Sequence, residues 1–124
     1  LYPGNSIPDT IRRMREVAPD VPMIAVKLGS EGVLFHGAGE PDLSWLPAIA
    51  EGVRDTTGAG DAFSGGALAG FVHSGTAIEA ALRGSVAGSF AVQSSGPVAL
   101  VSAHPEECEA RRSALLARLE ACPL

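Results

Sequence analysis

The feature that most constrains this chain is a short segment, residues 55–63, with the sequence Asp-Thr-Thr-Gly-Ala-Gly-Asp-Ala-Phe. Two glycines around a small alanine let the backbone turn tightly and leave its N–H groups uncovered. A helix is predicted to follow, over about residues 60–73, so these N–H groups would stand at the positive end of a helix dipole. The segment therefore predicts an anion-binding loop built from the backbone amides of Gly58, Ala59 and Gly60.

The acidic residue that follows this loop, Asp61, lies in the first turn of the predicted helix, beside the anion. A carboxylate there can accept a proton from a hydroxyl group that attacks a bound phosphoryl group. Phosphoryl transfer needs mainly positioning, charge neutralisation and such a base. Asp61 is therefore the candidate catalytic residue, although outside this pattern it would be an ordinary first-turn acid.

Other glycine-rich motifs do not match this segment. A Walker A loop requires Gly-Lys-Ser/Thr, and this loop contains no lysine. A dinucleotide-binding fingerprint requires a third glycine at the position that Phe63 occupies. A pair of carboxylates for glycoside hydrolysis, Asp55 and Asp61, stays formally open, but that chemistry gives no reason for the glycines between them.

The first part of the chain predicts a helix followed by a hairpin. Ser6 can cap a helix over residues 7–17, which has apolar residues on one face. Residues 23–26 form a short apolar run, which predicts a strand buried on both faces of a parallel sheet. A glycine-rich turn at 29–32 and a second apolar run at 33–36 complete a predicted hairpin.

The middle of the chain predicts further strands and two helices. Residues 43–49 indicate an edge strand that ends at Pro47, and residues 52–55 a short strand that enters the glycine-rich loop. Glycines in the helix over 60–73 weaken an isolated helix by about 1 kcal/mol each, so we expect this helix to be buried and closely approached by its neighbours. The sequence Thr-Ala-Ile-Glu is a capping box that begins a helix over about 76–92.

The last predicted helix begins at Pro105, ends near Pro123 and carries both cysteines, Cys108 and Cys122. Along a helix their separation would be about 21 Å, which is beyond the reach of a disulfide. We therefore expect reduced thiols, which are typical of a cytoplasmic protein. The chain opens without an initiator Met or a secretory signal, and its first residues indicate a fragment of a longer protein.

Composition excludes several classes of protein. The net charge of −5 argues against a general nucleic-acid binder. No apolar stretch reaches the length of about 18 residues that a membrane span needs. His36, His73 and His104 are scattered without metal-ligand spacing and are expected at the surface or at helix ends. The aromatic residues are expected in the core: Trp45, Phe63, Phe71 and Phe90.

The segment 55–63 closely resembles the C-terminal signature of the ribokinase-like (PfkB) carbohydrate kinase family. Residues 26–33, Val-Lys-Leu-Gly-Ser-Glu-Gly-Val, resemble the strand-turn-strand that this family places near the nucleotide, and residues 91–96 correspond to a helix end and turn. The resemblance covers roughly residues 7–96. It implies the C-terminal, nucleotide-binding and catalytic part of a three-layer α/β/α sandwich, built from a few strands, a hairpin and then helices.

The resemblance also implies a role for individual residues. Asp61 corresponds to the catalytic base, and Gly58, Ala59 and Gly60, with the Asp61 N–H, to the anion hole that holds the transferred phosphoryl group. Lys27, Gly29 and Gly32 correspond to the wall of the ATP pocket. A monovalent-cation site would be formed by the Asp55 carboxylate and the carbonyl groups of Thr57, Ala91, Ser94 and Gly96. The implied cofactors are ATP and Mg²⁺, with K⁺ as a possible activator.

The function that follows is ATP-dependent phosphorylation of a hydroxyl group of a sugar or a related small molecule. A nucleoside kinase of the same family is the alternative, since the signature is shared. The family's N-terminal half, which carries the lid and most substrate contacts, has no counterpart in the chain, so the isolated chain is expected to be inactive. A nucleotide-binding fragment without catalysis, or a domain without a ligand, therefore stays open, and a homodimer is possible for the full-length parent. Gly84 and Ser85 lie near the position where many members place a larger polar residue against the adenine.

Overall fold

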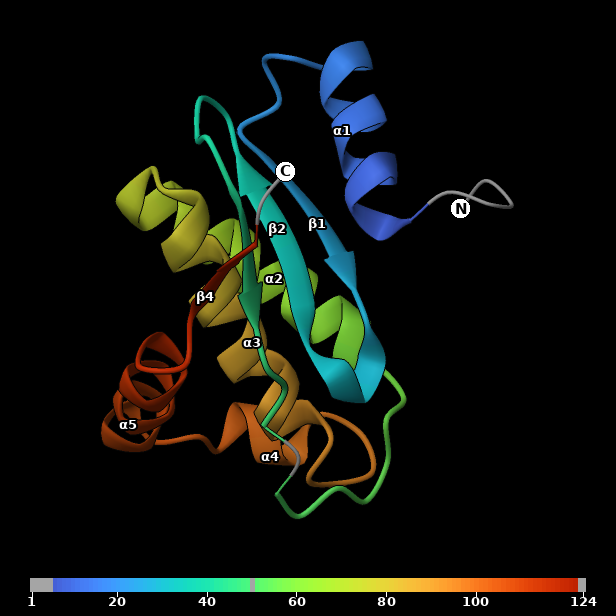
Figure 1. The fold of residues 1–124 in the computed structure, drawn as a ribbon. Helices are drawn as coiled ribbons and strands as arrows, with labels where there is room; N and C mark the ends of the chain where they lie inside the picture. Colours follow the sequence, from blue (N-terminus) through green and yellow to red (C-terminus); the bar gives the residue numbers. More distant parts are fainter. Residues whose placement is uncertain (1–5, 50, 123–124) are drawn as a thin grey trace.

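The computed structural model describes residues 6–49 and 51–122 (Figure 1). The residues that suggested a fragment, Leu1 to Gly4, lie outside this part. Four strands form an antiparallel sheet in the order β1-β2-β3-β4. The strands are β1 (Met23–Lys27), β2 (Val33–Gly37), β3 (Leu43–Leu46) and β4 (Glu120–Cys122), and the helices are α1 (Ile7–Val17), η1 (Gly29–Glu31), α2 (Ala59–Ser74), α3 (Ala77–Ala91), α4 (Val98–Val101) and α5 (Pro105–Leu116).

Helices cover both faces of the sheet, as the predicted sandwich requires. Residues alternate between the two faces along β2, where Val33 and Phe35 face α3 and Leu34 faces α1. Ile11 of α1, which is fully buried, packs on Ile24 and on other residues of this second face. On the opposite side α2, α4 and α5 pack against α3 (Figure 1).

The first helix forms over the predicted residues. The Ser6 hydroxyl accepts a hydrogen bond from the Asp9 amide at 3.3 Å, as expected of an N-cap. Only the first half of the predicted apolar face is buried, because Met14 and Val17 extend past the sheet and are exposed.

The predicted hairpin is confirmed, with Lys27 paired to Val33 across the turn. The prediction of a strand buried on both faces of a parallel sheet is wrong. β1 pairs antiparallel with β2, and Ala25 and Lys27 are exposed. A tight turn joins only antiparallel strands, and a short apolar run carries no period that could reveal an exposed side.

The strand at 43–46 ends before Pro47, as predicted, but it is not at an edge. β4, from the end of the chain, pairs with it and satisfies its outer backbone groups. The prediction that Cys122 belongs to the last helix is therefore wrong, because α5 ends at Leu116. Cys108 lies on α5 as a half-buried free thiol, while Pro123 falls outside the described residues.

The glycine-rich helix α2 packs against α3 at very short range, which confirms the predicted close approach. The predicted burial of this helix is wrong, because of its residues only Gly70 is buried, and Leu68 and Val72 are exposed. A Cβ placed on Gly66 would lie 2.7 Å from the Arg83 carbonyl oxygen, and one on Gly70 2.7 Å from the Glu79 carbonyl oxygen. A Cβ on Gly84 of α3 would in turn lie 2.8 Å from the carbonyl oxygen of Phe63. The two backbones therefore touch at these three glycines.

The start of α3 confirms half of the predicted capping box. The Thr76 hydroxyl accepts from the Glu79 amide at 3.3 Å. The Glu79 carboxylate does not return to the cap but pairs with Arg112 of α5 and with Arg83. The bond from Arg112 holds the pKa of Glu79 below its usual value. This contact joins α5 to α3.

One of the three histidines contradicts its prediction, since His36 is buried. Arg15 Nε donates to His36 Nδ1 at 3.2 Å, so the ring carries its proton on Nε2, which donates to the Glu40 carbonyl at 2.8 Å. His73 and His104 lie at helix ends, as expected. Of the aromatic residues predicted to lie in the core, Phe90 is buried, and Trp45, Phe63 and Phe71 are half-buried.

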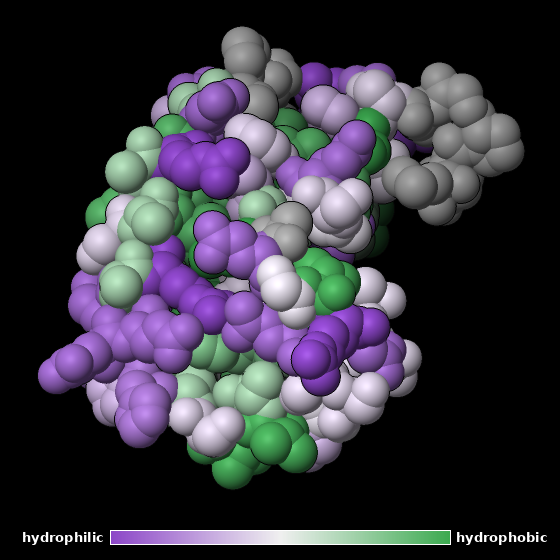
Figure 2. Space-filling model, turned by 90° about the horizontal axis from the view of Figure 1, so that it is seen from below, coloured by the Kyte–Doolittle hydropathy of each residue, from purple (hydrophilic) through white to green (hydrophobic). Residues whose placement is uncertain are grey.

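The surface viewed in Figure 2 is mixed, with hydrophobic residues emerging in several separate places among hydrophilic ones. The exposed large hydrophobic residues include Val53, Val98 and Val101. Within residues 6–49 and 51–122, each helix is too short or too polar to traverse a lipid bilayer.

The contact between α2 and α3 gives a matched pair of variants in the complete protein. Gly66→Ala should lower the free energy of unfolding by about 1–3 kcal/mol, because the added methyl group meets the backbone of α3. Gly65→Ala on the open side of α2, where a Cβ meets nothing within 4 Å, should raise it by about 1 kcal/mol through helix propensity. Denaturant unfolding measures both. Equal effects of the two substitutions would contradict the described packing.

Candidate active site

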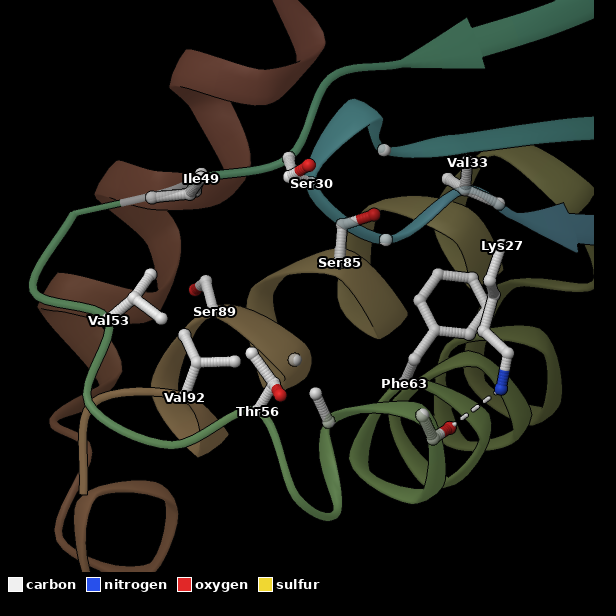
Figure 3. A pocket seen from close by; sticks show the side chains of 16 residues that line it. Lys27, Ser30, Val33, Ile49, Val53, Thr56, Phe63, Ser85, Ser89 and Val92 are labelled. Carbon is white, nitrogen blue, oxygen red and sulfur yellow. Dashed lines mark hydrogen bonds between the residues drawn. The ribbon is translucent and has the colours of Figure 1, made fainter. Parts of the chain in front are cut away.

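A cavity of about 370 Å³ lies between the β1–β2 turn, residues 48–49 and 53–56, the first turns of α2 and one face of α3 (Figure 3). Its lining is mostly apolar side chains and glycine. The hydroxyl groups come from Ser30, Thr56, Ser85 and Ser89, and the charged side chain is that of Lys27.

The two ends of the cavity differ in chemistry. Figure 3 shows Lys27 and Phe63 at one end, where α2 begins, and Ile49, Val53 and Val92 at the other. One end therefore carries the positive charge of Lys27, and the other is formed mainly by aliphatic side chains. Such a shape suits an elongated ligand with an anionic end and a flat apolar end.

The three residues predicted to line an ATP pocket all line this cavity. Lys27 Nζ donates to the Gly60 carbonyl at 3.1 Å and lies 5.9 Å from the centre of the Phe63 ring, so the strand end is fastened to α2. Gly29 and Gly32 have φ of 60° and 102°. Position 32 requires glycine for a second reason besides its positive φ, because a Cβ there would overlap the Leu46 carbonyl.

The glycine-rich loop ends in a helix start that has no side-chain cap. Gly58 is the N-cap, with φ of 82°, a left-handed conformation that favours glycine. The Ala59 amide donates to the Thr56 carbonyl at 3.3 Å. Throughout residues 6–49 and 51–122, the amides of Gly58, Gly60 and Asp61 find no acceptor. Three of the four amides predicted to bind an anion are thus available, and Ala59 is used internally.

Asp61 lies in the first turn of α2, next to Gly60 in the cavity wall, but its side chain is exposed and is not part of the lining. The structure therefore separates the carboxylate from the cavity. A group that met Asp61 would approach from the open side of the loop, while a ligand in the cavity would approach the loop from within.

The segment before the loop forms no strand, contrary to prediction. The amides of Arg54 and Asp55 both donate to the Val92 carbonyl at the end of α3, at 2.7 and 3.2 Å. This end of α3 offers a free carbonyl group, which takes the place of a strand partner. The Asp55 carboxylate accepts from the Thr57 amide at 2.9 Å, and this hydrogen bond lowers the pKa of Asp55.

The predicted cation ligands are only partly brought together. Asp55 lies beside the end of α3, which includes Ala91, but the nearest carbonyl, that of Val92, is already bonded. The Gly96 carbonyl accepts from the Ser94 hydroxyl at 3.2 Å. In the described part of the chain no group of three or more His, Cys, Asp or Glu side chains could hold a metal ion. One carboxylate with backbone carbonyls is a donor set that suits potassium better than a transition metal.

Several cavity residues were missed by sequence reasoning. Ser89 and Val92 follow Ser85, which was expected near the adenine, at spacings of four and three along one face of α3, a helical stripe that could have indicated a shared surface. Ile49 and Val53 carry no such signal, because they belong to an irregular loop. Gly84 does not line the cavity, since it packs on Phe63.

The Asp55–Thr57 turn predicts a response to acid. Because the pKa of Asp55 is lowered below 3.8, the bond from the Thr57 amide is complete at neutral pH and is lost only as the pH falls through that lowered value. In the complete protein labelled with ¹⁵N-threonine, the Thr57 amide proton should shift upfield over this range. The Asp55→Asn variant should show no such transition. A Thr57 amide unaffected by acid in the wild-type protein would contradict the turn.

Comparison with known proteins identifies the family. Residues 3–103 match the model of the pfkB family carbohydrate kinase. The 2-dehydro-3-deoxygluconokinase of Escherichia coli strain K12 is 37% identical over 101 residues, which is 79% of this chain and 32% of that protein.

Two solved structures with similar folds are a ribokinase and a nucleoside kinase. The ribokinase of Thermotoga maritima has a TM-score of 0.70 and 28% identity, over 88% of this chain and 35% of that one. The nucleoside kinase of Burkholderia thailandensis, in complex with inosine, has a TM-score of 0.66 and 30% identity, over 82% and 34%. The chain thus spans about a third of the length of these relatives, and the predicted ribokinase-like α/β fold is confirmed. The chain belongs to the pfkB family of carbohydrate kinases.

Proposed function

We propose that this chain is the C-terminal, nucleotide-binding and catalytic part of an ATP-dependent kinase that phosphorylates a hydroxyl group of a sugar or a related metabolite. The observation that carries the proposal is the uncapped start of α2, where Gly60, one of three residues with an unpaired amide, lines a cavity with one apolar and one cationic end. The complete kinase would work in the cytoplasm, where ATP is available, and a homodimer is compatible with this role.

The shape of the cavity supports one orientation of the nucleotide. The purine base would lie at the apolar end, near Ile49, Val53 and Val92. The phosphate groups would point to the end where Lys27 meets the first turn of α2. Backbone amides and the helix dipole then face the negative charge, as in other anion sites at helix ends. ATP combines a flat ring with a transferable phosphoryl group and so fits a cavity with these two ends.

In this arrangement Asp61 acts as the general base. Its carboxylate would accept the proton of the acceptor hydroxyl on the open side of the loop, while the amides of Gly58, Gly60 and Asp61 stabilise the charge on the transferred group. The exposed position of Asp61 agrees with an acceptor that arrives from outside the nucleotide cavity. Asp61 and the amides would thus act on opposite sides of the same phosphoryl group.

Metal ions would have a supporting part. Mg²⁺ is expected to arrive with ATP and to neutralise its phosphate charge, since this chain provides no carboxylate cluster among its described residues. Asp55, beside the end of α3 and the carbonyl groups of Ala91 to Gly96, is the candidate for a K⁺ site that fixes the loop. A nucleoside is the second candidate acceptor, because the inosine-bound Burkholderia kinase is 30% identical to this chain.

Substitution of the proposed base tests the mechanism. In the complete protein, Asp61→Asn should lower kcat by about 10²–10⁴-fold, because the amide cannot accept the hydroxyl proton. ADP affinity should change little, since the side chain does not line the cavity. Asp42→Asn, which alters an exposed acid in the loop before β3, is the control and should leave kcat unchanged. A full kcat in Asp61→Asn would refute the assignment.

A panel of acceptors tests the reaction class. Sugars, sugar acids and nucleosides would be offered to the complete protein with MgATP, with and without K⁺, and ADP formation recorded. We expect turnover with at least one sugar or sugar acid and a higher rate with K⁺. Turnover with nucleosides alone would favour the second candidate, and no ADP formation with any acceptor would refute the kinase proposal.

A further inference from the structure

Arg111 is a multiply bonded side chain near the cavity that the proposed function does not use. It extends from α5 to α3, where its guanidinium carbon lies 3.7 Å from the centre of the Phe90 ring. Nη1 donates to Ser89 Oγ at 2.8 Å, and Nη2 donates to Gln93 Oε1 at 3.0 Å and to Glu107 Oε1 at 3.1 Å. The side chain is 15% exposed, so most of these bonds are shielded from water.

The first of these bonds reaches the wall of the nucleotide cavity. Ser89 is buried and lines the cavity. Its hydroxyl donates its proton to the Val86 carbonyl at 2.6 Å and accepts from Arg111. Both sides of this hydroxyl are therefore used within the protein, and Ser89 presents a fixed surface to the cavity. Without Arg111 the buried oxygen would lose its donor, which is costly in a shielded place.

The second bond leads to the opposite wall. The guanidinium group fixes the Gln93 amide with its oxygen toward α5, so that Nε2 points away and donates to the Glu51 carbonyl at 3.2 Å. Glu51 is the first residue of the segment 51–56, which contributes Val53 and Thr56 to the cavity wall. The Gln93 side chain therefore fastens the start of this loop, and the Val92 carbonyl fastens its middle through Arg54 and Asp55.

We propose that Arg111 is a positioning residue for nucleotide binding, which holds the α3 wall through Ser89 and the wall of residues 51–56 through Gln93. The proposal rests on the function proposed above. A guanidinium group suits this role because its planar fork can serve two acceptors at fixed angles. Arg111 itself does not line the cavity, so it acts on the ligand only through its two partners.

The neighbouring Arg112 provides a matched control. It also joins α5 to α3, through Glu79, and has a similar exposed fraction of 25%. Its partner lies at the start of α3 and is not part of the cavity wall. Loss of either arginine weakens the attachment of α5, but only Arg111 is bonded to residues that line or fasten the cavity.

The test uses the complete protein and measures ADP affinity by calorimetry, together with thermal unfolding and separate KM values for ATP and for the acceptor. Arg111→Met should weaken ADP binding by about tenfold and raise the KM for ATP similarly, with an unchanged KM for the acceptor. Arg112→Met should lower the unfolding temperature comparably and leave ADP affinity unchanged. Gln93→Leu, which breaks only the link to residues 51–56, should weaken ADP binding by a smaller factor.

The outcomes separate this inference from the proposed function. If the wild-type protein does not bind ADP, both are overturned. If it binds ADP and Arg111→Met binds equally well, or if Arg111→Met and Arg112→Met weaken binding to the same extent, only the role of Arg111 is overturned. If Arg111→Met does not fold, Gln93→Leu decides, and an unchanged ADP affinity in that variant overturns the role.

Discussion

The direct contact between the backbones of α2 and α3 is the constraint on which the rest of this structure depends. Gly66 and Gly70 of α2 and Gly84 of α3 remove the side chains that would separate the two helices. The first turn of α2 is thereby held beside the cavity-lining face of α3, and the glycine-rich loop that precedes it becomes part of the cavity wall. Packing and the site are therefore consequences of the same small residues.

The sequence predicted the local features of this fold well. The limits of α1, the hairpin with its turn glycines and the start of α3 follow from capping residues and from glycines in left-handed conformations, which act over a few residues. Long-range pairing was not predictable in the same way. β4 pairs with β3 from the other end of the chain, and Arg15 reaches His36 across the sheet, and neither contact leaves a periodic pattern in the sequence.

The candidate site shows the same division. The cavity contains Lys27, Gly29, Gly32 and Gly60, which belong to contiguous motifs and were predicted. The apolar wall was missed because its residues come from a loop and from one face of a helix, which meet only in three dimensions. Ala59 was predicted as an anion ligand, but its amide is used by Thr56, since the tight turn closes on itself there.

The helix start at Gly58 has a consequence for the energetics of the whole domain. α1 and α3 complete their first turn with the side chain of their own N-cap residue, whereas α2 leaves that position to whatever occupies the loop. An anion bound there would accept the hydrogen bonds that a capping side chain otherwise accepts. The order of the first turn of α2 therefore depends on the concentration of the ligand. By mass action the same binding event adds to the stability of the folded state. The fraction of loops that hold an anion and the rigidity of the first turn of α2 are thus linked. A mutation of the loop that changes one of them is expected to change the other.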